Sequence, residues 1–186
     1  MKSREINSLF ENLSKVIKNP KSDLKYKNKF TLLVSVVLSA QCTDVNVNNV
    51  TRNIYQKYNK PLHFVRLGRK KIEKLIKSIG LFRNKAKSVY LLSKQLIEKH
   101  KSKVPGNFDN LYDLPGVGKK TASVVLNEGF GMPTIAVDTH VFRVSNRTGL
   151  AQGKNPDKVQ EKLYKIVPKK YLKKAGQTLL LHGRYT

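Results

Sequence analysis

A Pro/Gly-rich stretch near the middle of the chain, LPGVGKKTA at residues 114–122, has the residue types of an anion-binding turn. Gly116 and Gly118 allow backbone conformations that a side chain forbids, and they leave amide N–H groups accessible. A helix is predicted to begin at about Lys119, so its positive dipole end faces the same place. The stretch therefore predicts a phosphate-binding hairpin after a short helix capped by Asn107. An ordinary helix connection is the alternative.

Lys120 stands just inside the helix that this hairpin opens. The helix dipole, the neighbouring Lys119 and any partial burial would each disfavour its ammonium form. A neutral lysine is a nucleophile, and an amine beside a bound phosphate backbone can attack C1′ of a sugar and form a Schiff base. On position alone, a lysine that contacts phosphate or only solvent is the simpler interpretation.

Asp138 precedes a predicted helix over residues 139–147. It suits the N-cap of that helix, and its carboxylate also suits a role in base departure, by stabilising an oxocarbenium-like sugar or relaying protons to an amine. Both roles can hold. His140, Arg143 and Arg147 share one face of the same helix, which predicts either contacts with backbone phosphates or a salt bridge to the other lobe.

The composition favours a polyanionic partner. The 186 residues include 37 Lys and Arg against 12 Asp and Glu, a formal net charge of +25. Such an excess favours nucleic acid as a class of partner, although part of it follows the Lys-, Asn- and Ile-rich composition and points to no specific site.

Cysteine and histidine usage limits the chemistry further. The single cysteine, Cys42, and four scattered histidines exclude a disulfide framework and a metal site built from several thiolates of this chain. Cys42 itself is expected to be a small, buried or half-buried residue rather than a reactive thiol. No signal-peptide pattern and no apolar run of membrane-spanning length are visible, so we expect a soluble, cytoplasmic protein.

The elements that must position these residues are predicted to be helices, since no convincing strand alternation occurs. Residues 30–40 are apolar almost all round and predict a buried helix, with a buried strand as the main competitor because of its valines. The helix after Leu81 has an apolar stripe, and its lysines, Lys85 among them, are expected to face other directions. Further helices are predicted over 6–17, 47–55 after a Thr43 or Asp44 cap, 72–79, 156–166 and 170–181, with an extended segment at 132–137.

Four segments recur together, in order and spacing, in one known family: SAQCTD at 39–44, GL at 80–81, LPGVGKKTA at 114–122 and VDTHVFRV at 137–144. They resemble the bacterial endonuclease III group of the helix-hairpin-helix Gly/Pro-Asp DNA glycosylases. The resemblance covers nearly the whole chain, and its specificity lies in the combination of hairpin, lysine and aspartate. In this family the lysine marks the bifunctional branch.

The resemblance implies an all-α, two-lobed fold with a DNA-binding cleft between the lobes. One helical barrel lobe would comprise residues 21–132 and contain the helix-hairpin-helix at about 107–130, and the other would comprise 1–20 and 133–186. The implied function is base excision repair: a monomer would remove oxidised pyrimidines from double-stranded DNA in the bacterial nucleoid and cut the strand by β-elimination, as an abasic-site lyase. A non-catalytic DNA-binding module or an inactive fragment is the alternative.

The resemblance also implies roles for individual residues. By matching position, Lys120 would be the Schiff-base nucleophile, and Asp138 the carboxylate that works with it. Gln41 would fill the hole left by the flipped base, and Leu81 would enter the stack of the opposite strand. The remaining DNA-binding candidates are Gly116, Gly118, Lys119, His140 and Arg143.

The chain departs from the family at its C-terminal end. Endonuclease III usually carries a [4Fe-4S] cluster held by four cysteines, and by resemblance these would follow Thr186, the last residue of the closing LHGRYT. The sequence therefore encodes no metal ligands of that set; we expect a truncated sequence rather than a natural loss, and a cluster only if the loop is restored. A second departure is Gly176, expected to weaken the last helix by about 1 kcal/mol relative to Ala.

Overall fold

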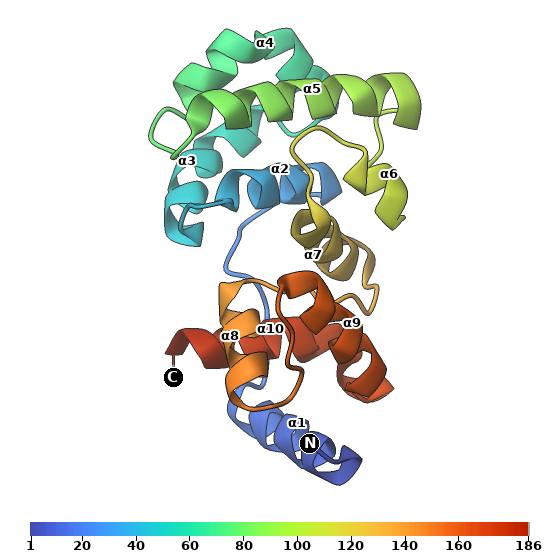
Figure 1. Cartoon of the computed structure of the whole chain (residues 1–186). Coiled ribbons are helices and arrows are strands. Elements are labelled where there is room, and N and C mark those ends of the chain that lie inside the picture. Colours follow the sequence, from blue (N-terminus) through green and yellow to red (C-terminus); the bar gives the residue numbers. More distant parts are fainter. Residues whose placement is uncertain (186) are drawn as a thin grey trace. The chain divides into compact units, whose positions relative to one another are not determined.

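The chain folds into helices joined by short connections (Figure 1), as described by a computed structural model of residues 1–185. It divides into two compact units. The first comprises residues 1–22 and 131–186, and the second comprises 23–130. No strand occurs among the described residues, which confirms the all-α prediction.

The second unit contains the helices α2 (Lys29–Ser39), α3 (Asp44–Lys57), α4 (Pro61–Leu75), α5 (Phe82–His100), α6 (Phe108–Tyr112) and α7 (Lys119–Phe130). It is built around the buried helix α2, which contacts α3, α5 and α7. In addition, α4 packs against α5, and α6 packs against α7.

The polar residues of α2 explain how a nearly all-apolar stretch remains a helix. The Asn28 side chain accepts a hydrogen bond from the Thr31 amide at 2.9 Å, which caps the first turn. Ser35 Oγ and the Tyr55 hydroxyl of α3 lie 2.8 Å apart in the core, so each buried hydroxyl has a partner. The competing strand interpretation of this stretch is therefore wrong.

α4 begins earlier than predicted and is broken in the middle. Pro61 occupies its first turn, where the missing N–H costs nothing. Gly68 has φ 72° and ψ 157°, a conformation open to glycine alone in practice, and it separates two helical halves. The prediction began at residue 72 because this break interrupts the apolar periodicity of the first half.

The first unit contains α1 (Ser3–Val16), α8 (Thr139–Arg147), α9 (Pro156–Ile166) and α10 (Lys169–Tyr185). α10 packs against α1 and α8, and α8 also contacts α9. The Phe10 and Tyr171 rings stack with centroids 5.5 Å apart between α1 and α10. None of the described helices is both long enough and apolar enough to cross a membrane.

One glycine lets α10 approach α8 closely. A Cβ on Gly183 would lie 2.7 Å from Val144 Cγ2 of α8, a distance that real Cβ atoms do not show. A Cβ on Gly176 would meet the Ala136 backbone nitrogen at 3.4 Å, which is an ordinary van der Waals contact. The packing therefore requires glycine at residue 183 and not at residue 176.

Candidate functional site

Two buried apolar side chains anchor the hairpin between α6 and α7 in the core. Leu114 and Val117 are 2% and 5% exposed, and the Val117 amide donates to the Leu114 carbonyl at 3.0 Å. Gly116 has φ +80°, and a Cβ there would lie 2.5 Å from Ser88 Cβ of α5. The turn is therefore fixed against α5 at the one position where only glycine fits.

The outer side of the same hairpin is open. Gly118, Lys119 and Lys120 are all exposed, and a Cβ on Gly118 would meet no atom within 4 Å. α7 begins at Lys119 as predicted, and the amides of its first turn have no acceptor within the helix. Bare amides, a helix N-terminus and two lysine ammonium groups together form a surface suited to a phosphate group.

Lys120 presents its amine to solvent from the first turn of α7. The partial burial that the sequence allowed for Lys120 is not present, because its side chain is exposed. An exposed amine at this place is accessible to a large substrate such as a DNA backbone.

Asp138 is the N-cap of α8, as the sequence predicted. Its Oδ1 accepts a hydrogen bond from the Val141 amide at 2.8 Å, and the side chain is half-buried. The extended segment before it is held by α9, because the Ile135 amide donates to the Tyr164 hydroxyl at 2.9 Å and the Ile135 carbonyl accepts from Gln160. The cap uses one carboxylate oxygen, which leaves the second for other chemistry.

His140 and Arg143 both contact the backbone of α10. His140 Nδ1 lies 3.2 Å from the Gly183 carbonyl oxygen, and the Arg143 guanidinium donates to the same oxygen. Both residues thus bond to a backbone carbonyl of their own unit, which is not the salt bridge to the other lobe that the sequence left open. A DNA contact by either residue stays a prediction.

Gln41 and Leu81 lie in two turns that the structure brings together. Both are exposed, and both have left-handed backbone conformations, with φ 52° and 57°, which are unusual for side chains of this size. A Cβ on Gly80 would lie 3.7 Å from the Gln41 carbonyl oxygen. The Asn46 side-chain Nδ2 donates both to Cys42 Sγ at 3.3 Å and to the Ser78 carbonyl at 3.2 Å, which links the two turns.

Lys85 lies beside these turns. It was expected to face away from the apolar stripe of α5, and this prediction is wrong, because the side chain is buried. It is 6% exposed, and its Nζ has no hydrogen-bond partner among the described residues. Burial lowers the pKa of Lys85, and an electrostatic interaction with Cys42 acts in the opposite direction. The signal was present in the sequence, because Lys85 falls on the three- and four-residue spacing of the apolar stripe.

The candidate residues are divided between the two units. The hairpin, its lysines and the two strained turns belong to residues 23–130, whereas Asp138, His140 and Arg143 belong to the other unit. Each unit therefore carries one of the two candidate catalytic groups.

The chain offers no ligand set for a metal centre. Residues 1–185 contain no group of three or more His, Cys, Asp or Glu side chains placed to hold a metal ion. With Cys42 as its one cysteine, this chain does not fit a [4Fe-4S] cluster, and no chemical step below involves one. Thr186, the residue after which the cluster cysteines were expected, lies outside the described residues, so the structure does not test that expectation.

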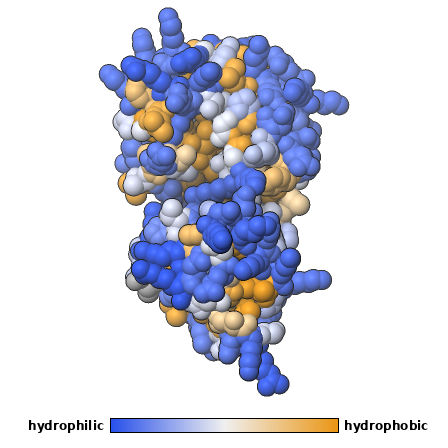
Figure 2. All heavy atoms as spheres, in the orientation of Figure 1, coloured by the Kyte–Doolittle hydropathy of each residue, from blue (hydrophilic) through white to orange (hydrophobic). Residues whose placement is uncertain are grey.

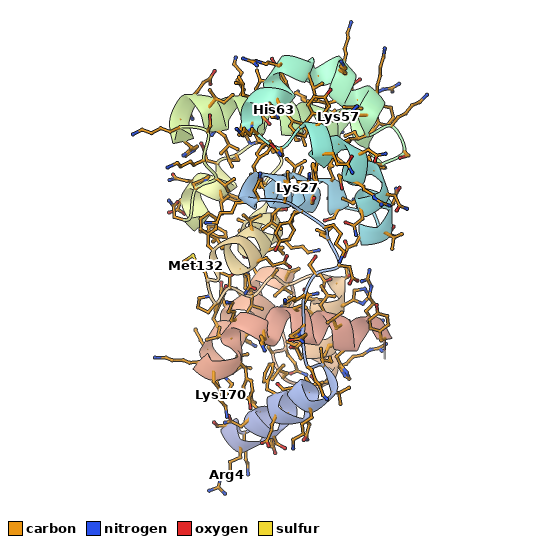
Figure 3. The ribbon with its side chains drawn as sticks, turned by 180° about the vertical axis from the view of Figure 1, so that it is seen from behind. Arg4, Lys27, Lys57, His63, Met132 and Lys170 are labelled. Carbon is orange, nitrogen blue, oxygen red and sulfur yellow. The ribbon has the colours of Figure 1, made fainter. Side chains whose placement is uncertain are left out.

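The surface carries the charge that the composition predicts. The face in Figure 2 is mostly hydrophilic, with separate apolar spots. Nitrogen-tipped side chains project from the ribbon over both units in Figure 3, and the labelled Arg4, Lys57 and Lys170 are exposed. A formal net charge of +25 on a molecule of this size is suited to a polyanion.

These features, a glycine hairpin before a lysine-bearing helix and an aspartate cap on a later helix, occur in a defined protein class. A model of the HhH-GPD superfamily of base excision DNA repair proteins matches residues 34–169, and the chain belongs to this superfamily. Endonuclease III of Rickettsia conorii is 52% identical over 185 residues, which cover 100% of this chain and 88% of that protein. Endonuclease III of Escherichia coli K12 is 48% identical over 168 residues, covering 90% and 80%.

Solved structures agree with this assignment. A trapped endonuclease III–DNA covalent intermediate, an estranged-adenine complex, matches with a TM-score of 0.94 and 40% identity, covering 100% of this chain and 87% of that one. A non-covalent endonuclease III–DNA complex matches equally well. The resemblance to endonuclease III and the prediction of a base excision repair DNA glycosylase are confirmed, and the non-catalytic binding module is not favoured.

Proposed function

We propose that this chain removes oxidised pyrimidines from double-stranded DNA and then cuts the strand at the resulting abasic site, acting as a monomer. The observation that carries the proposal is the exposed Lys120 amine in the first turn of α7, directly after a hairpin with open glycine amides. The trapped covalent intermediate of endonuclease III with DNA supports a covalent route in a relative of this chain.

The proposed reaction begins with attack of the neutral Lys120 amine on C1′ of the damaged nucleotide. A bond forms between Nζ and C1′, the bond from C1′ to the base breaks, and the base leaves with the bonding electron pair and takes up a proton. Ring opening gives a Schiff base between Lys120 and the sugar. A water nucleophile would stop at the abasic site, whereas the Schiff base permits the next step.

The second stage cuts the strand. The Schiff base acidifies the C2′ proton, and its removal expels the 3′ phosphate as the bond from C3′ to oxygen breaks. Water then hydrolyses the imine and returns the Lys120 amine. We assign Asp138 to stabilising the oxocarbenium-like sugar and relaying protons, using the oxygen that does not cap α8.

The DNA is proposed to bind through its backbone and at the lesion. The amides of Gly116 and Gly118, together with Lys119, would hold a phosphate, because that side of the hairpin is open. Gln41 would fill the space left by the flipped base, and Leu81 would enter the stack of the opposite strand. Their exposed, strained backbone conformations support these roles, because such strain concentrates at functional sites. His140 and Arg143 would add contacts from α8.

Borohydride trapping tests the proposal. The purified chain is incubated with duplex DNA carrying thymine glycol or an abasic site, and borohydride reduces the Schiff base to a stable adduct. We expect an adduct with the starting protein, none with Lys120→Gln, and an unchanged yield with Lys94→Gln, an exposed lysine of α5. Binding without an adduct in the starting protein would contradict the lyase mechanism.

A further inference from the structure

Lys85 is a buried cation that the proposed chemistry does not use. It is 6% exposed, and its Nζ makes no hydrogen bond with any residue of 1–185. Its amide donates to the Leu81 carbonyl at 3.0 Å, so it stands one helical turn after Leu81. A buried ammonium group without an acceptor is costly, because it has lost its hydration and gained no replacement.

The same ammonium group is also coupled to the second candidate turn. It interacts electrostatically with Cys42, the residue directly after Gln41. Cys42 is in turn joined through the Asn46 side chain to the Ser78 carbonyl, just before Gly80 and Leu81. Lys85 therefore lies where the turns of Gln41 and Leu81 meet.

Three unfavourable features coincide at this place. Gln41 and Leu81 both have left-handed backbone conformations without being glycine, and Lys85 is buried without an acceptor. Each destabilises the free protein, and such features persist where function requires them.

We propose that Lys85 is a positioning residue for lesion recognition: when Gln41 and Leu81 enter the DNA, their turns present a carbonyl oxygen to Lys85 Nζ, and this hydrogen bond holds both side chains in the inserted position. The inference rests on the proposed function, because it requires insertion of these residues at a lesion. The proposed role of Lys85 differs from a purely structural role in its effect on stability. A structural lysine stabilises the free protein, whereas Lys85 destabilises the free protein and stabilises the bound one.

The first test compares stability with activity. Lys85→Met keeps the chain length and removes the charge, and Lys94→Met makes the same change at an exposed position of α5. We expect Lys85→Met to raise Tm by roughly 2–4 °C. We also expect it to slow single-turnover excision of thymine glycol at saturating protein about tenfold, because inserted groups lose their alignment. Affinity for undamaged duplex should not change.

Parallel loss of Tm and activity, including failure of Lys85→Met to fold, would show a structural role and overturn the inference. A raised Tm with an unchanged excision rate would overturn it too. Lys94→Met should match the starting protein in both measurements.

The second test uses Cys42, the only cysteine, as a reporter. Its side chain is half-buried, so iodoacetamide can reach it. In the starting protein, a duplex with an abasic site should slow the alkylation of Cys42 more than undamaged duplex does. In Lys85→Met, the two duplexes should slow the alkylation of Cys42 equally. An equal response to the abasic site in both proteins would refute the inference. Both proteins in this test carry Lys120→Gln, so that no Schiff base forms at the abasic site. The readout therefore separates failure of the inference from failure of the proposed reaction.

Discussion

Gly116 and Gly118 are two residues apart in one hairpin, and they lack side chains for different reasons. Gly116 needs φ +80° and has Ser88 where a Cβ would lie. Gly118 has open space around the same position. The protein itself therefore explains the first glycine, whereas the second is explained only by something that approaches the hairpin from outside.

This contrast gives a paired prediction. Gly118→Ala should lower affinity for duplex DNA about tenfold, because a methyl group would keep the phosphate from the amides, with little change in unfolding free energy. Gly116→Ala should lower the free energy of unfolding by about 1–3 kcal/mol through overpacking against Ser88. Fluorescence anisotropy and urea unfolding measure the two effects. Unchanged DNA affinity in Gly118→Ala would remove the hairpin from the phosphate site.

Lys85 should also leave a signature in the pH dependence of stability. Burial lowers its pKa in the folded protein below the ordinary 10.5. Below the pKa of Lys85 in the folded protein, the side chain is charged in both the folded and the unfolded protein, so burying the charge lowers the free energy of unfolding in full. This loss of stability fades as pH rises towards 10.5, where the unfolded chain also loses the proton. The gain in unfolding free energy from Lys85→Met should therefore be largest at neutral pH and shrink as pH rises.

Urea unfolding from neutral pH upward measures this trend. Both proteins should carry Cys42→Ser, so that titration of the neighbouring thiol does not contribute. Lys94→Met provides the comparison without burial, and its difference from the starting protein should be flat. A difference for Lys85→Met that grows with pH would mean that the ammonium group is stabilised in the folded state.

At the scale of elements, α8 depends on Asp138 as its cap. Asp138→Asn should retain the stability of the unit, because asparagine caps a helix as well as aspartate does, whereas Asp138→Ala should cost about 1 kcal/mol. Both variants should lose excision of thymine glycol, since neither supplies a carboxylate. Thermal unfolding beside a single-turnover assay separates the two roles. Full excision by Asp138→Asn would leave Asp138 with capping alone.

The packing of α10 on α8 gives another element-scale prediction. Gly183→Ala should destabilise the protein by about 1–3 kcal/mol, because its Cβ would overlap Val144. The change should also disturb the Gly183 carbonyl that His140 and Arg143 share. Gly118→Ala is the control, because a Cβ on Gly118 meets no atom within 4 Å. Gly149→Ala is not suitable, because Gly149 has φ +70°, where any other side chain strains the backbone. Urea unfolding of Gly183→Ala beside Gly118→Ala makes the comparison, and equal stability would show that α8 and α10 tolerate a wider separation.

Helix positions and caps were the predictable part of this fold. Asn107, Thr43 and Asp138 all cap the helices expected of them, because capping is a local interaction between a side chain and the next turn. The burial of residues 30–40 followed equally from composition. Such features depend on a few neighbouring residues.

The less predictable features depend on contacts between distant residues. The break at Gly68, the burial of Lys85 and the close approach at Gly183 each depend on an element elsewhere in the sequence or on a backbone conformation that composition does not encode. The left-handed conformations of Gln41 and Leu81 are of the same kind. Lys120, Asp138 and the hairpin glycines could be named from residue type and spacing, whereas Gln41 and Leu81 were named through family resemblance. The proximity of the Gln41 and Leu81 turns emerged only from the structure.

At the scale of the whole molecule, charge should govern the strength of DNA binding. A formal net charge of +25 implies many lysine and arginine contacts with phosphates, and each contact releases counterions from the duplex. The affinity for undamaged duplex should therefore fall steeply as salt rises. Titrations across a salt series measure the slope, and Lys119→Gln should reduce it by about one unit. A flat profile would rule out a phosphate-based interface.

The broken helix α4 has a consequence for how the second unit opens. A continuous helix of residues 61–75 would share one ladder of hydrogen bonds, whereas Gly68 leaves two short ladders that end against each other. Short ladders fray at low free-energy cost. Amide protons on either side of Gly68 should therefore exchange with deuterium independently and ahead of those in α2, which makes α4 the segment from which local unfolding of this unit begins.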